Sequence, residues 1–305
     1  MNPKSGSHRR DTHPAMGSTE MSGTGALQSA VIASDEARRA LEAANAQAEY
    51  PAERLDIDAM KIAQHWDRYT AEDHEVWRTI FDKRMAQLEH SGSRVFLRGA
   101  EAIALSRNEV PRLGDVNALL TPMTGWSSHA VPGYIPARCF FAFLAKRQFP
   151  TTITVRPKSQ MDYLPEPDII HDVFGHVPLH TDPSFAEFLQ IYGQAALTTD
   201  DPVHTERLAR LFWFTVEFGL IHEDGRLKLY GSGLISSEGE GHHALVSPEV
   251  DRRPFDLERV CDTAFEIHHY QPILYVLDSF EQLADAMNRY AKKLLELRRV
   301  RKVAA

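Results

Sequence analysis

One stretch, residues 165–179, constrains this chain more than any other: Pro-Glu-Pro-Asp-Ile-Ile-His-Asp-Val-Phe-Gly-His-Val-Pro-Leu. It places two histidines, His171 and His176, and two acidic residues, Asp168 and Asp172, in an apolar run that prolines bound on both sides. Buried polar groups cost free energy unless they find hydrogen-bond partners or a metal ion. The pattern therefore predicts a buried helix that carries a polar site.

A second apolar stretch, residues 211–221, carries a single carboxylate, Glu217, in its middle. Two neutral imidazoles and one carboxylate are the ligand set of the facial triad of non-haem Fe(II) oxygenases. His171 and His176 are five residues apart, about 140° round a regular helix. Both reach one ion only if the helix distorts, ends near Gly175, or has the metal against its C-terminal turn. Spacing alone leaves open a buried helix with two hydrogen-bonded histidines and no metal.

The wording of both stretches resembles the catalytic domain of the pterin-dependent aromatic amino acid hydroxylases, whose signature is Pro-Glu-Pro-Asp-x-x-His-(Asp/Glu)-x-x-Gly-His-Val-Pro-Leu. Residues 213–220, 230–237 and 69–77 also resemble that family, so the likeness covers roughly residues 65–285. It is strongest with the short bacterial phenylalanine hydroxylases. The resemblance implies a monooxygenase whose fold is mainly α with a few short strands, α+β by count.

The resemblance implies that Fe(II), a tetrahydropterin and O2 are needed for catalysis and that phenylalanine is the substrate. It assigns His171, His176 and Glu217 as the metal ligands. It assigns Arg156 to the substrate's α-carboxylate, a role that suits a planar guanidinium. Asp168 is expected to hold that arginine in place.

Two further residues are assigned to the substrate by the resemblance. Trp213, four residues before Glu217 and on the same face of a regular helix, is expected to form a wall for the ring, and Ser236 to lie near the carboxylate. The pterin is placed against a loop and the start of the next helix, with an acid that hydrogen-bonds the pterin ring or a water. These expected cofactor contacts are Gly133, Tyr134, Ile135, Ala137, Phe140 and Asp172.

The position of attack on the ring is expected to depend on Cys139 and Thr154, which are both small and polar here. In the usual bacterial para-hydroxylases the matching positions differ, and the second is commonly a bulky aromatic residue. The pairing resembles that of the phenylalanine 3-hydroxylases, which make meta-tyrosine for secondary metabolism. Because a displacement of about 1 Å can change such an outcome, 3-hydroxylation is the expected reaction. The first alternative is 4-hydroxylation, followed by hydroxylation of tryptophan or tyrosine.

Two alternatives come from other classes, a zinc hydrolase and a non-catalytic binding protein. The hydrolase would have to use Asp172 as its general base, because no glutamate lies beside either histidine. The net charge of −8 disfavours a nucleic-acid partner. No run approaches the roughly 20 apolar residues of a membrane span, and no secretory signal is visible. Cys139 and Cys261 do not suggest a disulfide framework. A cytoplasmic monomer is expected, since no long heptad helix for assembly is seen.

Residues 1–50 are expected to be disordered or loosely attached, residues 51–296 to form the catalytic domain, and residues 297–305 to form a basic tail. Two helices are expected within residues 57–90, the second beginning with a capping box of Thr70 and Asp73. The patterns also predict a strand at 151–156, a hairpin turn at 222–226, and helices near 26–48, 116–120, 137–147, 185–192, 204–219 and 280–297. Residues 231–239, rich in small side chains, are expected to be flexible.

Overall fold

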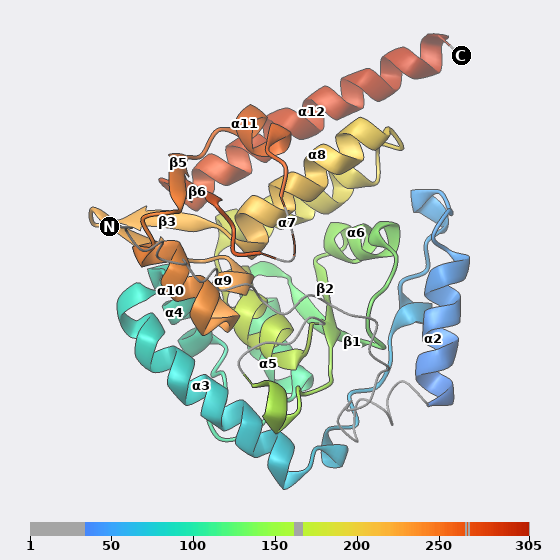
Figure 1. Ribbon diagram of the computed structural model, residues 1–305. Helices are drawn as coiled ribbons and strands as arrows, with labels where there is room; N and C mark the ends of the chain where they lie inside the picture. The colour runs from blue at the N-terminus through green and yellow to red at the C-terminus, as the bar shows by residue number, and fades with distance from the viewer. Residues whose placement is uncertain (1–33, 162–166, 266, 268, 305) are drawn as a thin grey trace, which may run out of the picture.

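The computed structural model describes residues 34–161, 167–265, 267 and 269–304 (Figure 1). Residues 1–33, the larger part of the segment expected to be disordered or loosely attached, lie outside these residues. Within them, helices dominate and the strands are short, which confirms the expected fold class. None of the helices in the described part of the chain is both long and apolar enough to cross a membrane.

Most of the described residues belong to helical elements of three kinds: α-helices, π-helices and 3-10 turns. The α-helices are α2 (Asp35–Ala46), α3 (Ala71–Ser91), α4 (Arg94–Ala102), α5 (Leu113–Thr124), α6 (Ala137–Ala145), α7 (Pro183–Ala196), α8 (Pro202–Phe212), α9 (Ser232–Ser236), α10 (Glu238–Val246), α11 (Leu257–Asp262) and α12 (Phe280–Ala304). The π-helices are η5 (Ile170–His176) and η7 (Trp213–Glu217), and the 3-10 turns are η1 (Ala52–Arg54), η2 (Asp58–Met60), η3 (Trp66–Arg68), η4 (Lys158–Gln160) and η6 (Val177–Thr181).

The strands of the described residues form two small sheets, one of two strands and one of four. Strands β1 (Ser127–Val131) and β2 (Gln148–Thr152) pair in parallel, with the helix α6 between them in sequence. The second sheet has the order β4-β3-β6-β5, in which β3 (Leu220–Glu223) and β4 (Arg226–Leu229) form the expected antiparallel hairpin. Strand β6 (Ile273–Leu277) runs parallel to both β3 and β5 (Asp251–Pro254).

Two helices were predicted within residues 57–90, and the structure contains one of them, α3. The capping box is confirmed, because the Thr70 side chain accepts from the Asp73 N–H and the Asp73 side chain accepts from the Thr70 N–H. The expected helix before it is wrong, since residues 57–68 form only the short turns η2 and η3. Its hydrophobic spacing of three suits a tight 3-10 turn, in which residues three apart eclipse one another.

Helix α2 is packed and not loosely attached, in contrast to the sequence expectation. Ala37, Ala40 and Ala44 on its inner face are buried. Ala44 belongs to a small apolar cluster with Met60 and Cys139, so α2 lies against η2 and α6. Alanine is small and only weakly hydrophobic, so a face made of alanines gives a weak hydrophobic pattern in the sequence. The same small side chains let a helix pack closely against its neighbours.

The segment after β4 also differs from expectation. Residues 231–239, predicted to be flexible, contain the helix α9 and the start of α10. Leu234 and Ile235 of α9 are fully buried. Burial of these two apolar side chains stabilises a helix that is too short to form alone. The burial depends on contacts with distant segments, so the local sequence did not predict the helix.

Candidate active site

His171 and His176 lie on η5, which is a π-helix. In an α-helix the hydrogen bonds close on the fourth residue, and residues four apart share a face; in a π-helix they close on the fifth, and residues five apart share it. A distorted helix, one of the arrangements that the five-residue spacing left open, is therefore present. Glu217 ends a second π-helix, η7, where the Phe218 N–H donates to the Trp213 carbonyl at 2.9 Å.

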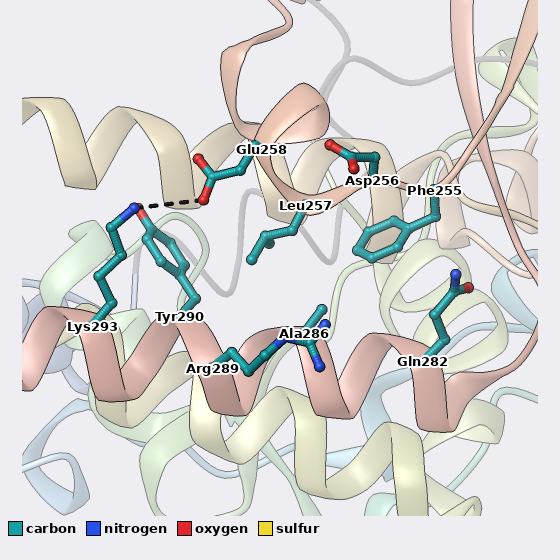
Figure 2. A pocket seen from close by; sticks show the side chains of 9 residues that line it. All are labelled: Phe255, Asp256, Leu257, Glu258, Gln282, Ala286, Arg289, Tyr290 and Lys293. Atoms are coloured by element: carbon teal, nitrogen blue, oxygen red, sulfur yellow. Dashed lines mark ion pairs between the residues drawn. The ribbon is translucent and has the colours of Figure 1, made fainter.

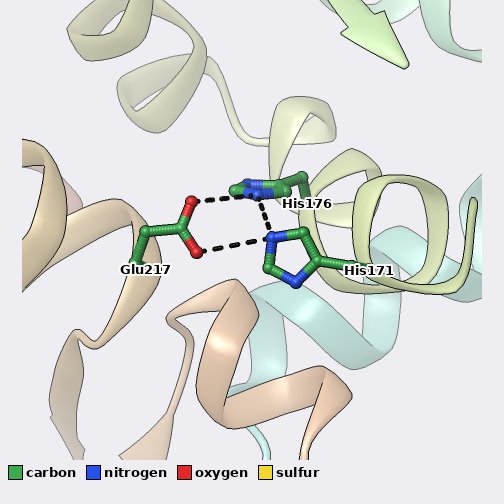
Figure 3. Close-up of side chains that lie close together, drawn as sticks. All are labelled: His171, His176 and Glu217. Atoms are coloured by element: carbon green, nitrogen blue, oxygen red, sulfur yellow. Dashed lines mark hydrogen bonds and ion pairs between the residues drawn. The ribbon is translucent and has the colours of Figure 1, made fainter. Parts of the chain in front are cut away.

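Figure 3 shows the side chains of His171, His176 and Glu217 converging from these two elements. The Nε2 atoms of the two histidines are 3.2 Å apart. His176 Nε2 is 3.3 Å from Glu217 Oε1, and His171 Nε2 is 3.5 Å from Glu217 Oε2. A divalent metal bound at about 2.1 Å by ligands at right angles holds neighbouring ligand atoms about 3.0 Å apart. The three groups therefore fit one ion held on one face.

Serines from α9 hold two of these side chains in orientation. Ser232 Oγ donates to Glu217 Oε2 at 2.7 Å. Ser236 Oγ lies 3.1 Å from His171 Nδ1, which leaves Nε2 directed at the other two groups. Hydrogen bonds to the far atom of a ligand fix its rotamer and tautomer, and their loss typically weakens metal binding 10–100-fold.

The electrostatics of the cluster favour the forms that bind a metal. Burial opposes ionisation of Glu217, but the two imidazoles and the hydrogen bond from Ser232 outweigh it and lower the pKa of this carboxyl to about 2. Burial lowers the pKa of His171 to about 4, despite the attraction of Glu217. A deprotonated carboxylate and a neutral imidazole are the protonation states that metal ligands require.

A cavity of about 330 Å³ opens directly onto this cluster. All three cluster residues line it, and so do the six residues expected to contact a pterin, Gly133, Tyr134, Ile135, Ala137, Phe140 and Asp172. Its remaining lining residues are Val131, Phe149, Pro150, Thr152, Pro167 and Phe212. A concave, largely apolar space with a few convergent polar groups is the usual form of a small-molecule site.

Arg156 and Asp168 form a buried bidentate pair beside the cluster. Arg156 Nε and Nη2 donate to the two carboxylate oxygens of Asp168, each at 2.9 Å. The same carboxylate accepts the backbone N–H groups of Arg156 and His171 at 3.0 Å. Asp168 therefore holds the guanidinium, as expected, and also fixes the start of η5. Burial opposes ionisation of Asp168, but the guanidinium and these hydrogen bonds lower its pKa.

Trp213, the expected wall for the substrate ring, lies on η7 four residues before Glu217, and that role stays a prediction. Phe212, the last residue of α8, lines the cavity together with Glu217. Trp213 Nε1 instead donates to Gln271 Oε1 at 3.0 Å, and its ring stacks on Phe265 with centroids 4.5 Å apart. Among the described residues, Trp213 is not part of the lining of this cavity.

The two residues expected to control the position of attack, Cys139 and Thr154, are both buried. Cys139 is fully buried in the cluster with α2, and its Sγ donates to the Ala44 carbonyl at 3.4 Å. Thr154 is buried on the extended segment between Thr152 and Arg156, and its carbonyl accepts the Ile169 N–H at 2.9 Å. Neither residue is among the described residues that line the cavity.

Two functional contacts were missed by the sequence analysis. Ser232 touches Glu217. Thr152 donates its backbone N–H to Asp172 Oδ2 at 2.6 Å, and its hydroxyl bonds the same oxygen. Burial raises the pKa of Asp172 to about 7, although these hydrogen bonds oppose the rise. A serine in a small-residue run and a threonine in a β-branched run give no sequence signal for such contacts.

A separate cavity of about 380 Å³ lies between the start of α11 and one face of α12 (Figure 2). Lys293 and Glu258 pair across its rim at 3.5 Å. Across the part of the chain that the structure describes, His171, His176 and Glu217 are the one group of three metal-binding side chains close enough to share an ion.

Comparison with known proteins agrees with this geometry. Residues 59–302 match the family model of the biopterin-dependent aromatic amino acid hydroxylases. The phenylalanine-4-hydroxylase of Ralstonia nicotianae is 43% identical over 239 residues, which cover 77% of this chain and 76% of that protein. The phenylalanine-4-hydroxylase of Chromobacterium violaceum is 41% identical over 231 residues, which cover 76% of this chain and 78% of that protein.

Solved structures of the Chromobacterium violaceum phenylalanine hydroxylase share this fold. The structure with bound iron(III) and oxidised 7,8-dihydrobiopterin has a TM-score of 0.74 and 40% identity, covering 78% of this chain and 86% of that chain. The structure with bound iron and phenylalanine has a TM-score of 0.72 and 39% identity, covering 76% of this chain and 84% of that chain. This chain therefore belongs to the family of biopterin-dependent aromatic amino acid hydroxylases and is a monooxygenase.

Proposed function

We propose that this chain hydroxylates phenylalanine to para-tyrosine and requires Fe(II), a tetrahydropterin and O2. The observation that carries the proposal is the single cavity shared by the three-residue cluster and all six expected pterin contacts. The names of the relatives support phenylalanine as the substrate, and the iron and dihydrobiopterin bound in the Chromobacterium violaceum structure support the cofactors. Bound iron and pterin would supply the oxygen activation.

The protein's own contribution is binding, orientation and exclusion of water. His171, His176 and Glu217 would hold the iron on one face, as their spacing allows. The guanidinium of Arg156, fixed by Asp168, would bind the substrate carboxylate, since a held planar fork loses little freedom when it forms this contact. Asp172 would hydrogen-bond the pterin or a water from the cavity wall.

Attack at the para carbon replaces the meta position favoured by the sequence analysis. That interpretation required Cys139 and Thr154 to shape the wall of the substrate pocket. The position of Cys139 against Ala44 does not support this role, and the relatives are phenylalanine-4-hydroxylases by name. The monomeric state and a cytoplasmic location stay predictions.

The product isomers test this proposal. The purified chain is incubated with Fe(II), a tetrahydropterin, O2 and phenylalanine, and the tyrosine isomers are separated by chromatography. We expect mostly para-tyrosine from the parent chain and from a Cys139→Ala variant. Mostly meta-tyrosine would overturn the proposed position of attack, but phenylalanine would still be the substrate. Absence of any tyrosine isomer, with the metal bound, would overturn the proposed substrate.

A further inference from the structure

Arg84, on α3, is a buried cation whose contacts are with neutral oxygens. Its side chain is only 4% exposed. The guanidinium donates to the carbonyls of Ile235 and Leu234 at 2.8 and 3.0 Å, and to the side-chain oxygen of Gln87. Burial lowers its pKa to about 10, with Glu238 partly opposing the shift. Within the described part of the chain no carboxylate contacts Arg84. A buried charge without such a partner is costly, so the carbonyls that Arg84 binds are of interest.

Those carbonyls belong to the last turn of α9. The earlier carbonyls of this helix have local partners, since Ile235 N–H donates to Gly231 and Ser237 N–H to Gly233. A five-residue helix ends before it can satisfy its last carbonyls, and its C-terminus is the negative end of its dipole. Arg84, distant by 151 residues in sequence, supplies both the donors and the positive charge.

Helix α9 is also the element that touches the metal cluster. Its first residue, Ser232, donates to Glu217, and its last residue, Ser236, bonds His171. The helix lies close to η5, because a Cβ added at Gly175 would be 3.2 Å from Ser232. A small shift of α9 would therefore change the orientation of two metal ligands at once.

We propose that Arg84 is a positioning residue for the metal centre. By holding the C-terminal carbonyls of α9, it fixes Ser232 against Glu217 and Ser236 against His171. The inference rests on the proposed metal site and extends it to a residue on another helix. Arg84 touches none of the cluster residues, so its effect on the metal passes through α9.

The test measures binding of Co(II), used as a probe for the divalent metal, to the metal-free chain. The variants are Arg84→Lys, which keeps the stem and charge but lacks the planar fork, and Arg84→Met, which removes every donor. Lys83→Met is the matched control, because Lys83 is half-exposed and pairs with Glu238 at 2.6 Å. We expect about tenfold weaker Co(II) binding and a changed visible spectrum for Arg84→Lys, and parental values for Lys83→Met.

A double-mutant comparison separates positioning from folding. If Arg84 acts through α9, Arg84→Lys should weaken Co(II) binding much less in a Ser236→Ala background than in the parent chain. Thermal unfolding of the metal-free variants reports stability in parallel. Parental Co(II) affinity and spectrum in Arg84→Lys, even with lowered stability, would overturn the inference and leave the proposed function intact. Failure of the parent chain to bind Co(II) would overturn the metal site and this inference together.

Discussion

The Glu217→Gln variant is expected to bind Fe(II) at least 100-fold more weakly than the parent chain and to form no measurable tyrosine. The change removes the negative charge and places an NH2 group where an oxygen now faces an imidazole at 3.3 or 3.5 Å. Loss of a direct ligand should exceed the roughly 10–100-fold effect of losing an outer hydrogen bond. Iron content after dialysis and tyrosine formation measure the two effects.

Glu206→Gln is the control for this prediction. Glu206 lies on α8, close in sequence to Glu217, but its side chain is mostly exposed and pairs with Arg210. Surface pairs of this kind contribute about 0–1 kcal/mol, so iron content and turnover should match the parent chain. If Glu217→Gln retained iron and turned over at the parental rate, Glu217 would not be a ligand.

The Asp168→Asn variant is expected to lose about 3–5 kcal/mol of unfolding free energy and most of its affinity for phenylalanine. The carboxylate accepts four hydrogen bonds, two from the Arg156 side chain and two from backbone N–H groups. An amide would present its NH2 group to some of these donors and leave the guanidinium buried without its counter-charge. Urea unfolding and the KM for phenylalanine measure the two losses.

Asp200→Asn provides a matched arginine–aspartate control. Asp200 pairs with Arg138 at the same 2.9 Å, but the aspartate side chain is 87% exposed. Its replacement should cost no more than about 1 kcal/mol, because water solvates the freed arginine. Equal losses in the two variants would contradict the claim that burial makes the Asp168 pair strong, and an unchanged KM in Asp168→Asn would contradict its role in holding Arg156.

Local sequence predicted the elements whose signals are local. The capping box of Thr70, the hairpin β3–β4 and the long final helix follow from residue preferences within a few positions. The metal cluster was predicted because Glu217 is the one acid in an apolar stretch, and because the two histidine segments resemble a known family. The five-residue spacing of the histidines left a distorted helix as one possibility, and η5 is such a helix.

The remaining features depend on contacts between distant segments. The turn preference of residues 231–239 is overridden because Arg84 and the core stabilise α9. Phe212 and Glu217, five residues apart, both line the cavity, a pairing that a regular helical period could not predict. Strand β2 begins at Gln148, before the β-branched run, because its pairing with β1 sets its register.

The central claim is that one metal ion binds between His171, His176 and Glu217, in the cavity that also takes the pterin. Anomalous diffraction at the iron edge, from crystals of the Fe(II)-loaded chain with a dihydropterin, tests it most directly. The account predicts a single iron peak within bonding distance of all three side chains and pterin density against Gly133, Tyr134 and Phe140. An iron peak elsewhere, or pterin density outside this cavity, would contradict it.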